Sequence, residues 1–482
     1  MKFFLGICIL TLMLILPSCG EEQRNNVHET DENENVVTAP TPEPNESYVS
    51  SLPAPLTVAK YDFSYDARLL VEAIEDAHPS FIMYGWPLDN YFAARDVFLS
   101  LAESDYLSVD DFTWAMRRYI TSLRDAHMNL FPLDEKFIDA KMVYYNGSVY
   151  IVHDDGTQSE IITIGGISTA RIIQNIDMYF YWENDIARLS AYSTFTGRKS
   201  LLLRSDADIL DDSIQITLRD GNDVVYESYS FTSIVPYGWL SLDWANLHVN
   251  WDNGYVINYR MINDIFYIRA SVFTCSSVQV EHIDSDYGVQ SIWTLCWFHD
   301  HVHDSIADAV SSGRRNFIID VRDNPGGNSM LAETLLEQMG MHGPAHGGYR
   351  RTSALTRAAH PDLTHIDYMV ALPSIEPASN SNDILLVVLM NINTASSAML
   401  FATWVQDGNL GYLIGEPSGQ SPSAFGDMLN ISLPQSGIDV PISHLRINRA
   451  DVNADQLTLW PDIIVPSDEA LDVALEFMHN RR

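Results

Sequence analysis

Two adjacent serines stand where a buried strand is expected to give way to a helix. Residues 384–390 form an unbroken apolar run, which is typical of a strand buried on both faces, and a helical apolar spacing begins at Ala398. Ser396 and Ser397 lie in the turn between them. The free N–H groups and the dipole at a helix N-terminus stabilise an oxyanion or a partly ionised hydroxyl. The pattern fits a nucleophile, but it also fits an ordinary helix cap, where serine is common.

Three distant segments offer the other groups that acyl transfer requires. A second apolar strand begins at Asn316 and leads into Pro-Gly-Gly, in which Gly326 and Gly327 can present bare N–H groups to a ligand. His127 follows a helical segment, and Asp455 precedes a Trp-Pro-Asp sequence. Together these residues supply a nucleophile, an oxyanion donor, a base and a carboxylate.

These motifs resemble those of the C-terminal processing peptidases, which are serine peptidases of the tail-specific protease and tricorn type. The segments that carry the resemblance are DNPGG, TASSA, GEP, LPQSGIDVPI and PDIIV, and the likeness extends over nearly all of the chain after about Tyr61. The resemblance implies that Ser396 is the nucleophile and that Gly326 or Gly327 and the Ser397 amide form the oxyanion hole. It implies peptide-bond hydrolysis without a metal or an organic cofactor.

The base distinguishes two branches of this family. Many members use a lysine, but that position here is Ser421, and no lysine occurs after Lys199, so a Ser-Lys site in the catalytic domain is excluded. The other branch, similar to tricorn, takes a histidine from an L-x-D-x-H motif and a glutamate near the C-terminus. The matching residues are His127 and Asp455, with aspartate as a shorter carboxylate. His444 is the rival base within the catalytic domain.

The composition describes an acidic, folded chain. The 28 Lys and Arg residues against 64 Asp and Glu residues give a formal charge of −36, which repels nucleic acid and anionic membrane surfaces. A hydrophobic content of 46% and an aromatic content of 11% nevertheless indicate ample core. We therefore expect a multidomain protein with no nucleic-acid partner.

The N-terminus indicates export. Residues 1–18 are interpreted as a lipoprotein signal peptide, because Lys2 precedes an apolar run that ends in a sequence resembling a bacterial lipobox. The resemblance implies that Cys19 is lipidated and anchors the chain to the membrane on the outer side of the bacterial cell envelope. The alternative is an ordinary cleaved signal or a short membrane helix. Residues 19–56 are acidic and Pro-punctuated, as in a flexible tether.

Three folded regions are expected after the tether. Residues 57–135 show helical patterns, with His78 before Pro79 as a stop signal and a capping box from Ser108 to Asp111. Residues 136–240 are rich in β-like runs, with a hairpin turn at 220–221, and resemble a PDZ-like module. Such a module either captures peptide or acts as a spacer or gate. Residues 250–482 are expected to form the catalytic peptidase domain.

Two further features leave alternatives open. Cys275 and Cys296 are the cysteines that remain after the signal region, and in an exported protein they could form a disulfide. His299 and His303 fall one helical turn apart, but without a third ligand at a known spacing they favour a solvated helix start, and we predict no metal site.

The expected fold is α/β, with a ClpP/crotonase-like catalytic domain, a helical N-terminal domain and a PDZ-like β-rich module. The expected function is a serine-type endopeptidase that cleaves exported proteins or peptides through Ser396, His127 and Asp455. The alternative is a catalytically inactive peptide- or ligand-binding lipoprotein on the same scaffold. A serine-reactive fluorophosphonate probe distinguishes the two.

Overall fold

The computed structural model describes residues 63–103, 108–130, 135–233, 257–273, 302, 304–344, 346–359, 367–371 and 378–481. The predictions for the signal peptide, the tether, Cys19, Cys275, Cys296, His299 and His303 lie outside these residues. Within the described ranges, no helix combines the length and the apolar character that crossing a membrane requires.

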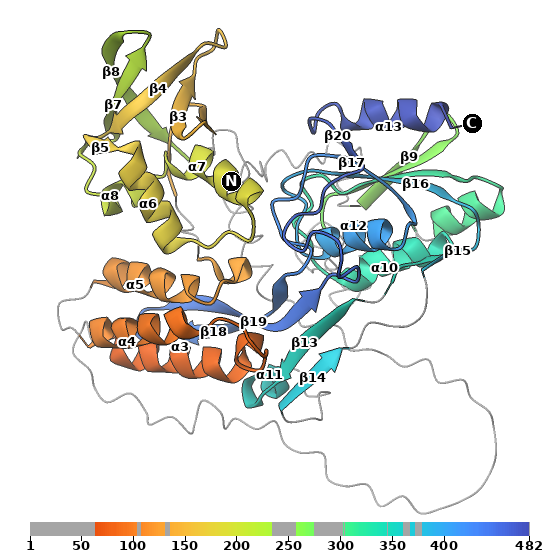
Figure 1. Cartoon of the computed structure of the whole chain (residues 1–482), viewed down its shortest axis with the longest axis horizontal. Helices are drawn as coiled ribbons and strands as arrows, with labels where there is room; N and C mark the ends of the chain where they lie inside the picture. Colours follow the sequence, from red (N-terminus) through yellow and green to blue (C-terminus); the bar gives the residue numbers. More distant parts are fainter. Residues whose placement is uncertain are drawn as a thin grey trace, which may run out of the picture.

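A six-stranded sheet forms the centre of the C-terminal part, in the order β20-β17-β16-β11-β10-β9 (Figure 1). Its strands are β9 (Ile257–Ile262), β10 (Ile265–Ala270), β11 (Asn316–Asp320), β16 (Leu385–Met390), β17 (Gly411–Gly415) and β20 (Ile463–Ile464). All neighbouring pairs are parallel except β9 with β10. Parallel strands end at one edge of a sheet, so the loops after β11 and β16 lie side by side.

Helices cover both faces of this sheet, as its continuous apolar strands require. Helices α10 (Ser329–Gln338) and α12 (Ser397–Asp407) share an apolar core with one face, and α13 (Ala470–His479) shares a second core with the other. The strand, turn and helix predicted around Ser396 are therefore confirmed.

A β-rich module follows the N-terminal helices. Its eight-stranded sheet contains β1 (Phe137–Ile138), β2 (Met142–Tyr145), β3 (Ser148–Val152), β4 (Gln158–Ile164), β5 (Ile167–Ser168), β6 (Ile209–Leu210), β7 (Ser213–Asp220) and β8 (Asp223–Thr232). Helices α6 (Thr169–Tyr179), α7 (Asp185–Phe195) and α8 (Lys199–Arg204) complete its core. The predicted hairpin is confirmed, because Asp220 pairs with Asp223 across the β7–β8 turn.

The described part of the chain begins with a group of helices. The elements are α3 (Ser64–Ala77), η1 (Pro79–Phe81), α4 (Asp89–Ala102), α5 (Val109–Thr121) and η2 (Ala126–Met128). The predicted capping box is confirmed, because the Ser108 side chain accepts a hydrogen bond from the Asp111 N–H at the start of α5.

These helices pack on a four-stranded sheet that belongs to the C-terminal half of the sequence. Its strands, in spatial order, are β14 (Asp367–Ala371), β13 (Gly347–Thr352), β19 (Ile438–Asn448) and β18 (Phe425–Leu433). Apolar side chains of β18 and β19 share one core with α3, α4 and α5, and Figure 1 shows these strands beside the helices. Segments from the two ends of the described chain therefore share one core. The remaining elements are α11 (Ala354–Ala359), β12 (Met341–His342) and β15 (Ser379–Asn380).

Candidate active site

Ser396 occupies the N-cap position of α12 in a backbone conformation that non-glycine residues rarely adopt. Its φ is 50° and its ψ is −123°. Its side chain makes no capping hydrogen bond, so the ordinary-cap alternative does not describe it. Residues held in such conformations cost ~1–3 kcal/mol and persist only where their surroundings impose the strain. Without a capping bond, and with no other hydrogen bond to the described residues, the Ser396 hydroxyl is available for chemistry.

The neighbouring loop holds this turn in place. Thr394 Oγ1 donates a hydrogen bond to the carbonyl oxygen of Val321 at 2.9 Å, and the Ala395 N–H donates to the carbonyl oxygen of Asn324 at 2.9 Å. Both acceptors belong to the loop that follows β11. The loops after β11 and β16 are thus one hydrogen-bonded unit.

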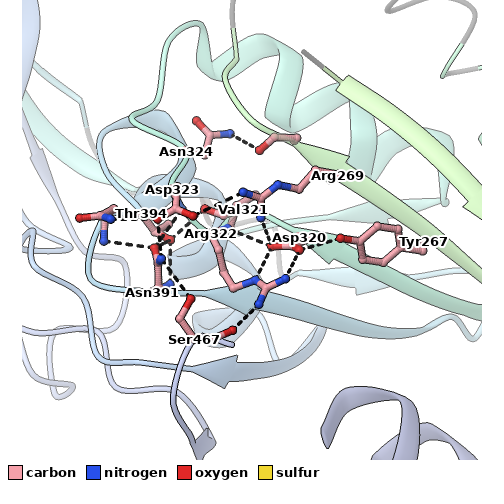
Figure 2. A network of polar contacts seen from close by, with 12 residues as sticks. Tyr267, Arg269, Asp320, Val321, Arg322, Asp323, Asn324, Asn391, Thr394 and Ser467 are labelled. Atoms are coloured by element: carbon pink, nitrogen blue, oxygen red, sulfur yellow. Dashed lines mark hydrogen bonds and ion pairs between the residues drawn. The ribbon is translucent and has the colours of Figure 1, made fainter. Parts of the chain in front are cut away.

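A buried ion network lies beneath this unit (Figure 2). Asp320, the last residue of β11, accepts hydrogen bonds from Arg269 at 2.6 Å, from Arg322 at 2.6 Å and from Tyr267 at 2.7 Å. Burial by itself would raise the pKa of Asp320, but the two guanidinium groups outweigh it and lower that pKa. Figure 2 shows the network continuing to Asn391, directly after β16. The ends of both strands are therefore joined by hydrogen bonds between Asp323 and Asn391 as well as by the sheet.

The two predicted glycines have different tasks. Gly326 has a φ of 105°, and a Cβ atom there would overlap the Cβ of Ser396 and lie 2.8 Å from the Ser397 nitrogen. Its own N–H donates to Asn324 Oδ1 at 2.8 Å, so Gly326 supplies space and not an oxyanion donor. Within the described residues, the N–H groups of Gly327 and Ser397 have no hydrogen-bond partner. The Ser397 hydroxyl donates to the Gly327 carbonyl oxygen at 2.5 Å and holds these two residues together.

His127 comes to the site from η2, the short turn after α5. Asp125 caps this turn, because its Oδ1 accepts from the His127 backbone N–H at 2.8 Å while its Oδ2 lies 3.3 Å from His78 Nε2. His78 is fully buried, so the residue interpreted as a helix stop also supports the backbone that carries His127. Burial lowers the pKa of His127, Asp125 opposes the shift and Arg446 adds to it. The imidazole is therefore neutral near neutral pH, as a base requires.

Gln420 connects Ser396 with His127. The Ser396 N–H donates to Gln420 Oε1, and Gln420 Nε2 lies 3.4 Å from His127 Nε2. A backbone N–H can only donate, so it fixes the orientation of the amide, and the amide NH₂ that faces His127 can also only donate. His127 Nε2 must then be the acceptor, which places the ring proton of the neutral imidazole on Nδ1. This is the tautomer that can take a proton from a serine hydroxyl.

A carboxyl group that sequence reasoning missed lies beside His127. Glu183, between α6 and α7, is 9% exposed, and its Oε2 accepts from the Ser421 N–H at 2.8 Å. One polar atom of each of Glu183, Asp125 and His127 lies within 4.8 Å of the other two. Burial is the main cause that raises the pKa of Glu183 to about 8. The Ser421 N–H and the Arg446 charge lower it, and the Asp125 charge raises it further.

Asn184 explains why Glu183 is in this place. Its Oδ1 caps α7 by accepting from the Ala187 N–H at 2.9 Å, and its Nδ2 donates to the carbonyl oxygens of Ser418 at 3.0 Å and Leu457 at 2.9 Å. The cap is a local pattern that the sequence could have revealed. The two long-range bonds, which bring the β-rich module to the catalytic part, were not visible in it.

Asp455 does not lie beside His127, and the prediction that it orients the imidazole is wrong. Its exposed carboxylate accepts from the N–H groups of Leu457 at 2.9 Å and Thr458 at 3.2 Å and from Trp460 Nε1 at 3.0 Å. The short side chain is satisfied by its own loop, as is common for aspartate in turns. Its carboxylate forms no ion pair with His127 in the described structure.

Ser421, at the position of the family's lysine, and His444, the rival base, also have other contacts. The Ser421 hydroxyl donates to the carbonyl oxygens of Ser423 at 2.8 Å and Gln456 at 2.6 Å. His444 is fully buried on β19, with its Nε2 3.3 Å from Asp427 Oδ2. His127 is the histidine that shares Gln420 with Ser396.

Asp125, His127 and Glu183 are residue types that bind metal ions, but their contacts do not favour a cation. Both Asp125 oxygens already have partners in the His127 N–H and the His78 ring. The positive charge of Arg446 is close enough to act on the pKa of Glu183.

Comparisons with known proteins place this geometry in context. Residues 291–465 match the model of peptidase family S41, and this segment contains Gly326, Gly327, Ser396 and Gln420. No curated protein gives a significant match. This segment is similar to peptidases of family S41.

Two solved structures share the fold. The chain matches the crystal structure of mature CPAF with a TM-score of 0.53 at 12% identity, covering 87% of this chain and 96% of that one. It matches mature CPAF complexed with lactacystin with the same score and identity, covering 88% of this chain and 97% of that one. At this identity the likeness concerns the fold.

Proposed function

We propose that the chain is a serine-type endopeptidase in which Ser396 is the nucleophile and His127 the base. The observation that carries the proposal is the convergence of three segments at the start of α12. The Ser396 hydroxyl is without a partner among the described residues, two N–H groups beside it are unused there, and Gln420 links it to a neutral histidine. The S41 family match supports peptide-bond hydrolysis as the reaction.

The geometry divides the chemistry among these groups. Ser396 Oγ attacks the substrate carbonyl carbon while its proton passes to His127 Nε2, which later returns it to the leaving amine. The N–H groups of Gly327 and Ser397 donate to the oxyanion. Gln420 Nε2 faces His127 Nε2, so the amide must move away before the Ser396 hydroxyl can donate to that nitrogen. Catalytic hydrogen bonds of enzymes often become short and well aligned only when substrate is bound.

The wider proposal concerns architecture and location. The six-stranded sheet with its helices serves as a ClpP/crotonase-like catalytic core, and residues 137–232 serve as a PDZ-like module. The substrates are exported proteins or peptides, and a lipid on Cys19 anchors the enzyme at the outer side of a bacterial membrane. The signal-like residues 1–18 and the lipobox-like sequence before Cys19 support this location.

Labelling with a fluorophosphonate probe tests the assignment. We expect the full-length protein to be labelled, Ser396→Ala to abolish labelling and casein hydrolysis, and Ser397→Ala, the matched control, to keep much of both. His127→Ala should be nearly as damaging as Ser396→Ala, because members of such a unit act together. Labelling that persists in Ser396→Ala would overturn the nucleophile. A wild-type protein that is never labelled would favour the inactive peptide-binding lipoprotein.

A further inference from the structure

Two buried polar atoms near the proposed base have complementary hydrogen-bonding character and no partner within the described part of the chain. They are His127 Nδ1 and Glu183 Oε1. Gln420 requires the ring proton to be on Nδ1, so Nδ1 is a donor, and an ionised Glu183 carboxylate is an acceptor. Buried donors and acceptors without partners are rare and call for an explanation.

We infer that Glu183 is the positioning residue of the site, and that its ionised Oε1 accepts the Nδ1–H of His127 and holds the imidazole in the productive tautomer. This inference rests on the proposed function. During attack the Ser396 proton moves to Nε2, the imidazolium keeps its Nδ1 proton, and the Glu183 carboxylate stays ionised and stabilises that cation. One polar atom of Glu183 lies within 4.8 Å of one of His127, and among the described residues the Glu183 carboxylate is hydrogen-bonded at Oε2 but not at Oε1.

Asp125 is the other carboxylate near the ring, but its contacts assign it to the backbone. Its Oδ1 lies 3.9 Å from His127 Nδ1 and already accepts from the backbone N–H of the same residue. Its Oδ2 is held by His78. An oxygen that caps a turn cannot approach the side chain of that turn without losing the cap. Of the four carboxylate oxygens of Asp125 and Glu183, Glu183 Oε1 is the one that is uncommitted among the described residues.

The charges that face Glu183 set the pH at which it works. Asp125 before η2 raises its pKa, Arg446 on β19 lowers it, and burial raises it more than either, to about 8. His127 lies opposite, and Tyr181 is close on the same segment, where burial is the main cause that raises the Tyr181 pKa and the Glu183 charge adds to it. Below this pH the protonated Glu183 would donate to Nδ1 and push the ring proton to Nε2, the wrong tautomer for a base. The rate at which the serine reacts should therefore increase as pH rises through about 8, the pKa of Glu183. Deprotonation of His127 alone would give this increase at a lower pH, because the pKa of His127 is lowered.

Glu183→Gln is a sharp probe because the Ser421 N–H fixes its orientation. That N–H needs an acceptor, so the amide oxygen of the variant faces Ser421 and the NH₂ faces His127 Nδ1. The variant thus mimics the protonated carboxyl at every pH. A site held in the wrong tautomer should lose rate by up to ~10⁴-fold, as serine proteases do when the triad aspartate becomes asparagine.

The experiment measures the second-order rate of fluorophosphonate labelling of the full-length protein from about pH 5.5 to about pH 9.5, a range that spans the histidine and Glu183 pKa values. Wild type should show an inflection near pH 8. Glu183→Gln should lack it, should match wild type at the acidic end and should fall at least ~100-fold behind above about pH 8.5. Glu183→Asp, which keeps the charge on a shorter side chain, should recover part of the alkaline rate. Thermal melting of each variant shows whether it is folded.

The outcomes separate this inference from the proposed function. If wild type and a folded Glu183→Gln had equal pH profiles, the role of Glu183 would be overturned. Labelling at Ser396 in the same experiment would still support the proposed peptidase. The inference would also be overturned if Asp125→Asn alone removed the inflection. If Glu183→Gln does not fold, the pH profile of the wild type still tests the inference. An inflection below about pH 6.5 would show that the pH dependence comes from His127 alone and would overturn the inference. Absence of labelling in wild type at every pH would instead overturn the proposed function.

Discussion

Ser396 has a positive φ, so we expect the variant Ser396→Gly to be more stable than the variant Ser396→Ala. Both variants lose the hydroxyl, so both should be inactive. Alanine keeps the strain of a non-glycine residue at φ 50°, which is ~1–3 kcal/mol. Glycine relieves it but adds conformational freedom to the unfolded chain, at a cost of ~0.4–1 kcal/mol. We therefore expect Ser396→Gly to be more stable than Ser396→Ala by ~0.5–2 kcal/mol.

The measurement compares urea unfolding midpoints of the two variants under identical conditions. The same pair of substitutions at Ser397 is the matched control, because Ser397 is the first helical residue of α12 and does not have a positive φ. There glycine should be less stable than alanine by ~0.5–1 kcal/mol. If the glycine variant were less stable than the alanine variant by the same amount at both positions, the reasoning that the backbone of Ser396 is strained would be refuted.

Three other predictions come from particular contacts. Gly326→Ala should lower labelling at least ~100-fold because its Cβ would displace Ser396, whereas Gly437→Ala, at a positive φ with open space around it, should alter stability without altering the labelling rate of the folded protein. Asp455→Asn should keep labelling within about twofold of wild type, because its carboxylate serves its own loop; a loss near ~10⁴-fold would restore it to the mechanism. Cys19→Ser should move the protein from the membrane fraction to the soluble fraction with unchanged specific activity, and retention on the membrane would indicate an uncleaved helix.

The sequence by itself determined the local elements of the site. The turn from β16 to α12, the capping box at Ser108 and the hairpin at Asp220 were all readable, and the structure confirms them. Each depends on residues within a few positions of one another, through apolar period, capping and turn preference. The sequence also brought attention to Ser396 and His127, because each lies in a short motif.

The tertiary structure alone decided which polar groups meet. Glu183 reaches the Ser421 N–H across 238 residues of sequence, and Gln420 reaches His127 across 293. No periodicity encodes such pairs, because they depend on how the β-rich module and the N-terminal helices pack against strands from the far end of the chain. Asp455 is the opposite case. Its position in a motif indicated a catalytic role, but in the structure its carboxylate accepts hydrogen bonds from its own loop. Burial then raised the pKa of Glu183, a glutamate without any sequence motif, to about 8, an effect of desolvation that only the folded chain produces.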